Sequence, residues 1–126
     1  MKKPTPLTTP NAPQAIGPYS QGMVTGNLLF LSGSIPLTPA GALVTGTITA
    51  QTEQIMSNIK ALLTASGIGF EQVIKTTCFL TNMNDFAEFN SVYSKYFLSK
   101  PARSTVAVSA LPKGVNVEVE VIAMLG

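Results

Sequence analysis

The sequence predicts a single α+β domain spanning residues 1–126, with two helices on one face of a mixed sheet. Three observations predict it. A chain of 126 residues is long enough for one hydrophobic core but not for two. The hydrophobic pattern changes period along the chain and gives the order β-β-α-β-α-β-β, with no repeat or linker. If both helices cover one face of the sheet, the other face has no helix to cover it, so we expect another subunit to cover that face.

The N-terminal third contains a predicted hairpin. Residues 1–18 hold five prolines and few apolar anchors, so we expect an extended or irregular segment there. Ser20–Thr25 and Leu28–Ser32 read as two strands around Gly26-Asn27. Gly33 follows the second strand, where a glycine either lets the backbone approach a ligand or marks a bulge. Residues 36–47 are predicted to form a loop.

The first helix is predicted from residue 49 to residue 66. Ile55, Ile59, Leu62 and Leu63 fall on one helical stripe, and Gly67 is the expected C-cap. The N-cap is either Thr47 or Thr49.

The middle of the chain predicts a strand and a second helix. Val73–Leu80 is β-branched and alternating, with Ile74, Cys78 and Leu80 expected on one face. The second helix should begin at Asp85, with Glu88 as its capping-box partner, and stop at Lys100-Pro101. Its apolar stripe is aromatic and consists of Phe86, Phe89, Tyr93 and Tyr96 or Phe97.

The C-terminal segment reads as two strands joined by a turn, Arg103–Ser109 and Val115–Met124. Alternate residues of a strand point to opposite faces. The valines of the second strand therefore share a covered face, which Val106 and Val108 should join. The opposite face should present Glu118 and Glu120 together with Arg103, Thr105, Ala107 and Ser109. Arg103 is the only arginine of the chain.

The composition excludes several classes of function. Charged residues are 11% of the chain, against roughly 25% in an average soluble domain, and this neutral surface favours an oligomer. The net charge of +2 is spread without a basic run, so nucleic acid is not an expected partner. With no histidine, Ser-His and Cys-His catalysis and most zinc sites within one chain are excluded.

The single cysteine and the absence of long apolar runs bear on the expected location. Cys78 has no partner for an intrachain disulfide, which fits a reducing compartment. No apolar run near the start could span a membrane, and Lys2-Lys3 is not followed by the apolar region of a signal peptide. We therefore expect a cytoplasmic protein with no membrane partner.

Several separated blocks together resemble a known family. AIGPYSQG, FLSGSIP, IKTTCFLTNMNDFAEFN, PARSTV and VEVEVIA occur in the same order as in the RidA (YjgF-type) enamine/imine deaminases. The resemblance runs nearly end to end. It implies a chorismate-mutase-like fold and a homotrimer with sites between subunits. It also implies hydrolysis of reactive 2-enamino or 2-imino acids, such as 2-iminobutanoate and 2-iminopropanoate, to 2-keto acids and ammonia, with no metal or organic cofactor.

The resemblance carries seven site residues onto this chain, and two features depart from the family pattern. The implied site residues are Tyr19, Ser32, Gly33, Asn90, Arg103, Thr105 and Glu118. Many members have cysteine at the position of Thr105, where threonine keeps the function if the backbone N–H is the working group. The connection from the second helix to Pro101 is also short for the family.

The chemistry of these residues suits an imino acid. Arg103, as a planar and permanent cation, is the expected anchor for the substrate carboxylate. Glu118 would position water and carry a proton if burial raised its pKa. Tyr19 is the third expected catalytic residue, whereas Ser32, Gly33, Asn90 and Thr105 are expected to bind substrate. Without the resemblance, a lone arginine at the start of a strand is more often a solvated or structural ion pair, and glutamates on an exposed strand face are usually solubility charges.

Two other classes of function compete with the deaminase. A regulatory protein could hold a small carboxylate in the same cleft without turnover, and it would need Arg103 but not Glu118. An endoribonuclease or translation inhibitor is also attributed to the family, but the chain has neither histidine nor a basic stripe.

Overall fold

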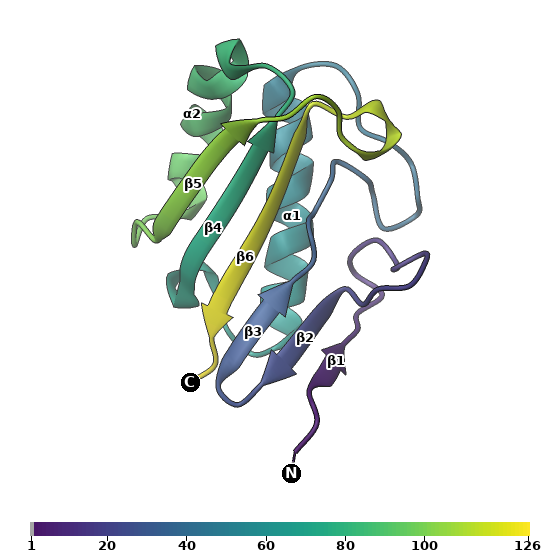
Figure 1. Cartoon of the computed structure of the whole chain (residues 1–126), viewed down its shortest axis with the longest axis vertical. Helices are drawn as coiled ribbons and strands as arrows, with labels where there is room; N and C mark the ends of the chain where they lie inside the picture. The colour runs from purple at the N-terminus through teal and green to yellow at the C-terminus, as the bar shows by residue number, and fades with distance from the viewer. Residues whose placement is uncertain (1) are drawn as a thin grey trace.

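The computed structural model describes residues 2–126 (Figure 1). The strands are β1 (Thr5–Leu7), β2 (Gly22–Thr25), β3 (Leu28–Leu31), β4 (Val73–Leu80), β5 (Ala102–Ala107) and β6 (Val117–Met124). The α-helices are α1 (Ile48–Ala65) and α2 (Phe86–Tyr96), and short 3-10 turns are η1 (Phe70–Gln72), η2 (Met83–Asp85) and η3 (Pro112–Gly114).

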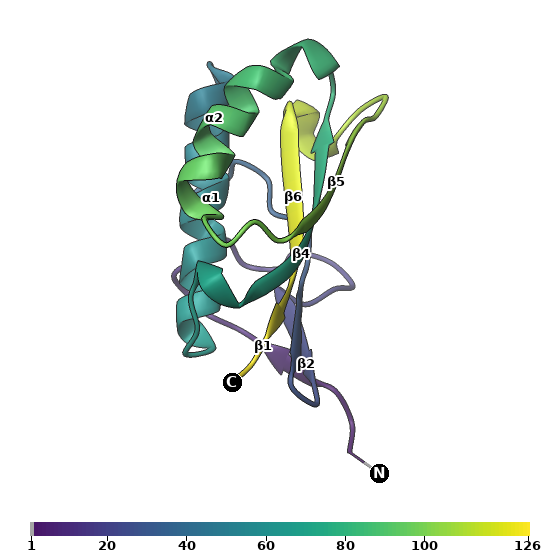
Figure 2. The same ribbon diagram turned by 90° about the vertical axis from the view of Figure 1, so that its left-hand side faces the viewer.

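One mixed sheet with two helices on a single face forms the fold, which confirms the predicted class. The strand order is β1-β2-β3-β6-β4-β5, in which only β4 and β5 run parallel. Both helices lie on the same side of this sheet, as the edge-on view shows (Figure 2). Within the described residues no helix covers the other face, which faces the viewer in Figure 1 and is called the open face below.

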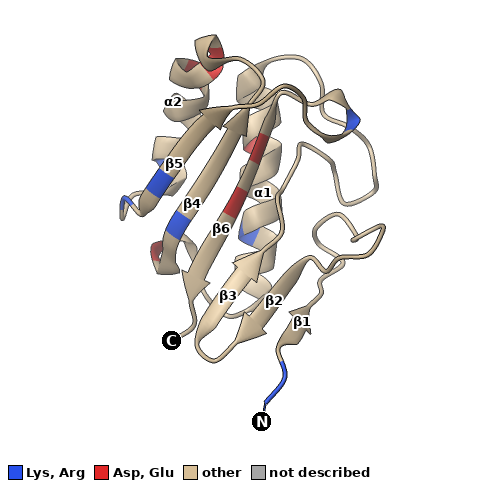
Figure 3. Ribbon diagram, in the orientation of Figure 1, with Lys and Arg blue, Asp and Glu red and all other residues tan. Residues whose placement is uncertain are grey.

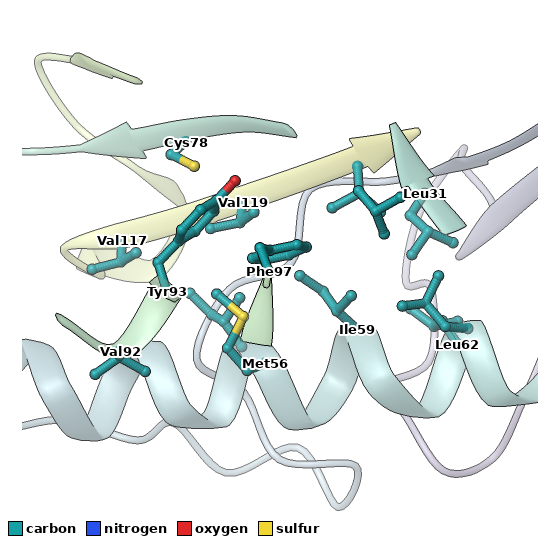
Figure 4. Packing of buried hydrophobic residues seen from close by; sticks show 14 of the residues in the cluster. Leu31, Met56, Ile59, Leu62, Cys78, Val92, Tyr93, Phe97, Val117 and Val119 are labelled. Atoms are coloured by element: carbon teal, nitrogen blue, oxygen red, sulfur yellow. The ribbon is translucent and has the colours of Figure 1, made fainter. Parts of the chain in front are cut away.

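The core lies between the sheet and the two helices. Val117, Val119 and Val121 of β6 are fully buried, as their alternation predicted. They pack in one cluster with Ile55, Ile59, Leu62 and Leu63 of α1. Phe89 and Tyr93 of α2 and Phe97 just after it close the cluster, so both predicted helical stripes are confirmed. Figure 4 shows Tyr93 and Phe97 in this cluster.

The helix ends are fixed by side chains from different elements. Thr47 is the N-cap of α1, and its hydroxyl accepts the Ala50 N–H at 3.0 Å. The predicted capping box of α2 is absent, because Asp85 makes no side-chain cap bond. Glu88 instead accepts hydrogen bonds from the N–H and hydroxyl of Thr49, both at 2.8 Å. The carboxylate thus joins the two helices instead of closing its own helix.

A sixth strand, β1, was missed in the proline-rich N-terminal segment. Thr5–Leu7 pairs antiparallel with β2, with Pro6 opposite Met23. β1 is an edge strand, and a proline is tolerated there because its missing N–H faces no further strand.

The C-terminal pair of strands is not a hairpin. β4 lies between β5 and β6, pairing parallel with the first and antiparallel with the second. The first of the two strands also starts and ends earlier than predicted, at Ala102 and Ala107 rather than Arg103 and Ser109. β4, which comes earlier in the chain, pairs with both C-terminal strands and separates them. The turn residues between these strands do not show whether a third strand inserts there.

A bulge in β4 displaces one predicted core residue. The register against β6 shifts between Val73 and Lys75, which places Ile74 outside the ladder. The bulge puts two residues of one strand opposite one residue of the other. Ile74 is therefore 46% exposed, whereas Cys78 and Leu80 are buried as predicted.

Candidate active site

Arg103 and Glu118 lie on opposite faces of the sheet, contrary to the prediction that they share one. Arg103 is paired with Thr76, and Thr76 is paired with the buried Val121. Paired residues of neighbouring strands point to the same face, so Arg103 and, by the same register, Thr105 are on the helix side. Glu118 pairs with Phe79 on the open face.

The predicted site residues therefore form two groups within one chain. Tyr19, Ser32, Gly33 and Glu118 line one cavity, and we call them the cavity half-site. Asn90, Arg103 and Thr105 lie on the helix side near the β5 edge, and we call them the arginine half-site. The acidic residues of β6 and the basic residue of β5 are separated by β4 (Figure 3).

The cavity of the cavity half-site has a volume of about 650 Å³. Its walls come from the segment after β1, from the segment after β3, from α1 and from η3 with β6. Apolar side chains such as Ile35, Leu37 and Leu62 line it together with polar groups. A mostly apolar cavity with a few polar groups is typical of a small-molecule site.

Gly33 makes room for the carboxylate of Glu118. A Cβ added to Gly33 would overlap Glu118 Oε2, so no larger residue fits while that carboxylate keeps its place. The backbone of Ser34 next to it is bridged to Val119 in both directions, at 2.7 and 3.1 Å. The glycine therefore allows the close approach of the backbone to the Glu118 carboxylate, a role different from the ligand approach or bulge predicted for it.

The surroundings of Glu118 favour its protonated form. Partial burial raises the pKa of this carboxyl, and the negative charge of Glu120 adds to the effect. Both effects act against the ionised carboxylate, because burial removes water and a like charge repels it. A carboxyl with a raised pKa can hold and transfer a proton nearer neutral pH than an ordinary glutamate.

The two hydroxyls of this half-site are oriented by their backbone partners. The Tyr19 hydroxyl accepts the Ile16 N–H at 3.4 Å, which leaves its own O–H to donate to a ligand. The Ser32 hydroxyl donates to the Ser20 carbonyl at 2.6 Å, so toward a ligand it can act as an acceptor. The cavity thus offers one donor and one acceptor beside the carboxyl.

In the arginine half-site, Asn90 contacts Arg103 directly. Nη1 of Arg103 donates to Asn90 Oδ1 at 2.6 Å, although the side chain is otherwise exposed. A guanidinium has five N–H donors, so most of them remain for a ligand. Asn90, predicted as a substrate-binding residue, orients Arg103 in this chain.

Thr105 lies beside the buried Cys78 in the ladder between β4 and β5. Its hydroxyl oxygen is buried and has no hydrogen-bond partner within residues 2–126. Cys78 is 0% exposed, and burial raises the pKa of its thiol to about 11. The thiol is therefore a protonated core group, as its alternation with apolar residues indicated.

Sequence reasoning missed the role of Gln21. Its buried amide donates to the carbonyls of Thr9 and Pro13, at 3.1 and 2.7 Å, and accepts the Thr9 N–H at 2.7 Å. These bonds hold the segment that forms one wall of the cavity. The only signal for this role was its place in the block AIGPYSQG, two residues after Tyr19.

Residues 2–126 contain neither a metal-binding cluster nor a membrane-crossing helix. No group of three or more Cys, Asp or Glu side chains there is arranged to hold a metal ion. Among the described helices, none is both long and apolar enough to cross a membrane.

Comparisons with known proteins agree with the fold and identify relatives. Residues 9–125 match the family model described as "Endoribonuclease L-PSP". The chain is 52% identical to "Protein HMF1" of Saccharomyces cerevisiae, covering 94% of this chain and 93% of that one. It is 43% identical to the "2-iminobutanoate/2-iminopropanoate deaminase" of Escherichia coli, covering 94% and 95%. A crystal structure of E. coli TdcF with bound serine superposes with a TM-score of 0.91 at 39% identity, covering 97% and 99%.

Proposed function

Because the chain belongs to the Endoribonuclease L-PSP family, which includes the RidA (YjgF-type) proteins, we propose that it hydrolyses 2-enamino and 2-imino acids. The products are 2-keto acids and ammonia, and 2-iminobutanoate and 2-iminopropanoate are the proposed substrates. The observation that carries the proposal is the Glu118 carboxyl. It lies against Gly33 with a raised pKa, in a cavity that also contains Tyr19 and Ser32.

The proposed site requires two copies of the chain. Arg103 would anchor the substrate carboxylate, and Glu118 would act on the imine carbon, but the two residues are on opposite faces of one sheet. A neighbouring copy that brings its arginine half-site to this cavity would complete the site. We propose a homotrimer with such a site at each subunit interface, the assembly that the family resemblance implies.

The proposed reaction needs one water and no redox step. An enamine first gains a proton at C3 to become the iminium form of the acid. Water then adds to C2, and Glu118 takes a proton from that water as the C–O bond forms. The proton passes to nitrogen, the C–N bond breaks, and the carbonyl forms as the nitrogen leaves. Iminium and water thus become keto acid and ammonium.

The other cavity residues have supporting roles in this proposal. The Tyr19 O–H would donate to the oxygen that enters at C2, and the Ser32 oxygen would accept from the leaving nitrogen. Their backbone partners, Ile16 and Ser20, leave these hydroxyls with suitable orientations. The bound serine of the TdcF structure is an amino acid with the same carboxylate as the proposed substrates.

A coupled assay tests the proposal. A threonine or serine dehydratase generates the imino acid in the presence of a trapping amine, and keto-acid formation is followed for wild type and Arg103→Ala. We expect wild type to accelerate the reaction and Arg103→Ala to lose the acceleration while still assembled. Lys60→Ala, which removes an exposed charge of α1, is the control and should behave like wild type.

If assembled wild-type protein does not accelerate keto-acid formation with any of several dehydratase substrates, the deaminase function would be rejected. Binding of a 2-keto acid without turnover would then favour the regulatory carboxylate-binding protein. Salt-dependent binding of RNA by the same preparation would favour the ribonuclease that the family description names.

A further inference from the structure

The guanidinium of Arg103 lies against two aromatic rings of α2. Its Cζ is 4.6 Å from the centre of the Tyr93 ring and 5.4 Å from the centre of the Phe86 ring. Both distances are within the range of a cation–π contact. The same guanidinium donates to Asn90 Oδ1 at 2.6 Å. Three side chains of one helix therefore contact Arg103.

These three side chains form one stripe of α2. Phe86, Asn90 and Tyr93 are spaced four and three residues apart, which places them on the same side of an α-helix. Arg103 itself lies in β5, which follows α2 in the chain, and the folded structure brings it against this stripe of the helix. Sequence analysis assigned the aromatic residues to the core, and Tyr93 is indeed buried. Its ring nevertheless has one face against a charged side chain.

The Tyr93 ring is held in place from behind. Its hydroxyl is hydrogen-bonded to the Thr76 hydroxyl at 2.7 Å, and Thr76 is the ladder partner of Arg103. The ring centres of Phe97 and Phe89 are 4.4 and 5.7 Å from it. Figure 4 shows Tyr93 pointing toward the strand of Cys78, with Phe97 nearby. Because the Tyr93 ring contacts neighbours on several sides, it can hold the Arg103 guanidinium that lies against it in one position.

We propose that Tyr93, with Phe86, is a positioning residue that holds the Arg103 guanidinium for the substrate carboxylate. The rings lie against the planar cation, and Asn90 accepts one of its N–H donors. A cation held in this way keeps its remaining N–H donors for a carboxylate, which a guanidinium can bind through two parallel hydrogen bonds. This inference rests on the proposed function for its ligand, but its geometry can be tested without turnover.

The single arginine of the chain makes the test direct. Uniformly 15N-labelled, assembled protein gives one arginine Nε–Hε signal, and aromatic rings stacked on the guanidinium shift it upfield by ring current. The variants are Tyr93→Leu, which removes the ring, and Tyr93→Phe, which keeps it. Tyr96→Leu is the matched control, because it removes another tyrosine ring of the same helix, one that packs on Phe70 and not on Tyr93 or Arg103. Binding of 2-oxobutanoate, the proposed product, is measured by calorimetry on each.

Wild type and Tyr93→Phe should show the upfield signal, and Tyr93→Leu should move it toward the position of an exposed arginine. We expect Tyr93→Leu to raise the Kd for 2-oxobutanoate roughly tenfold, from the size of a partly desolvated cation–π contact. Tyr96→Leu should change neither measurement. In turnover assays, Tyr93→Leu should raise KM with little change in kcat, because carboxylate binding serves ground state and transition state alike.

The outcomes separate this inference from the proposed function. An unshifted Nε–Hε signal in wild type, or equal 2-oxobutanoate binding by wild type and Tyr93→Leu, would overturn the positioning role even if the deaminase is active. A shifted signal that Tyr93→Leu abolishes, with no 2-oxobutanoate binding by wild type, would keep the aromatic support and reject the proposed ligand. If Tyr93→Leu does not assemble, Phe86→Leu, at the less buried ring, replaces it with the same expectations.

Discussion

Arg103 and Glu118 point to opposite sides of one β-sheet, with β4 between the strands that carry them. No side-chain rotation can bring the two groups together within one chain, because the sheet itself separates them. A reaction that needs both must take them from different copies. Mixtures of two mutants can therefore test whether two copies of the chain contribute residues to one site.

Mixing two inactive variants should restore activity. Arg103→Ala lacks the anchor and Glu118→Gln lacks the proton carrier, so neither has a working site alone. After co-refolding in equal amounts, a shared site has both wild-type residues in about a quarter of cases, from random assortment in a cyclic oligomer. Keto-acid formation by the mixture checks this. No recovery in mixed oligomers verified by mass spectrometry would mean that the residues do not work as a pair across an interface.

Gly33→Ala should abolish activity without unfolding the protein. The backbone of Gly33 is not in the left-handed region, so alanine is allowed there, and its Cβ would overlap only the end of the flexible Glu118 side chain. The carboxylate should move, and a misplacement of about 1 Å can cost roughly 100-fold in rate. The melting temperature should change little.

Gly69→Ala is the matched control for that substitution. A Cβ at Gly69 would come within 2.6 Å of a Glu71 carboxylate oxygen, a comparable clash with a flexible side chain outside the cavity half-site. It should keep full activity. Equal activity of Gly33→Ala and wild type would show that the position of the Glu118 carboxylate does not matter for the reaction.

Glu118→Gln should stabilise the protein at neutral pH but not in acid. Burial, aided by Glu120, raises the pKa of Glu118 in the folded state. Between the ordinary and the raised pKa, the folded chain binds more protons than the unfolded chain, so stability falls as pH rises through this window. Glutamine does not titrate, so the Glu118→Gln variant should not lose this stability as the pH rises. The gain in melting temperature over wild type should therefore be present at about pH 7 and absent below about pH 4.

Thermal melts at fixed protein concentration across this pH range check the prediction. Glu71→Gln removes the same charge at an exposed position and should show no comparable dependence. A Glu118→Gln variant that is less stable than wild type at neutral pH would show that the ionised carboxylate makes favourable contacts in the assembled protein.

Thr105→Val should be more stable than wild type. The buried Thr105 oxygen has no hydrogen-bond partner within residues 2–126, and removing an unsatisfied buried polar group gains about 1 kcal/mol in the free energy of unfolding. Activity should be retained if the site uses the backbone N–H of this residue. Denaturant unfolding and the keto-acid assay measure the two effects.

Thr76→Val should have the opposite effect on stability, because it removes a buried hydroxyl that does have a hydrogen-bond partner. Its hydroxyl is bonded to the Tyr93 hydroxyl at 2.7 Å, so its loss should destabilise by about 1 kcal/mol. A Thr105→Val variant that assembles normally but is inactive would assign a role to the threonine hydroxyl itself.

The sequence predicted the elements that depend on local periodicity. The bounds Val73–Leu80 of β4 agree with the prediction, and the alternation of the β6 valines correctly identified its buried face. The bulge at Ile74 and the edge strand with Pro6 could not be predicted, because both depend on the neighbouring strand. Alternation in the sequence predicts which face of the sheet a residue occupies only where the strand pairs with its neighbour without a bulge.

The candidate site could be predicted as a set of residues but not as an arrangement. The valines at positions 106 and 108 suggested which side of β5 is covered, yet Val106 is 44% exposed on the open face. Register with Thr76 determines where Arg103 points, and the sequence of a six-residue edge strand does not encode that register. The aromatic contacts of Arg103 have the same origin, since helical periodicity shows that Tyr93 is buried but not what its ring contacts.

The two edges of the sheet differ in their capacity to template misfolding. At one edge β1 is three residues long and contains Pro6, which has no N–H to offer an incoming strand. Short, proline-containing edges are a common defence against uncontrolled strand addition and fibre growth. The opposite edge, β5, is six residues long and has no proline. Protection against strand addition is therefore one-sided, because β1 has it and β5 does not.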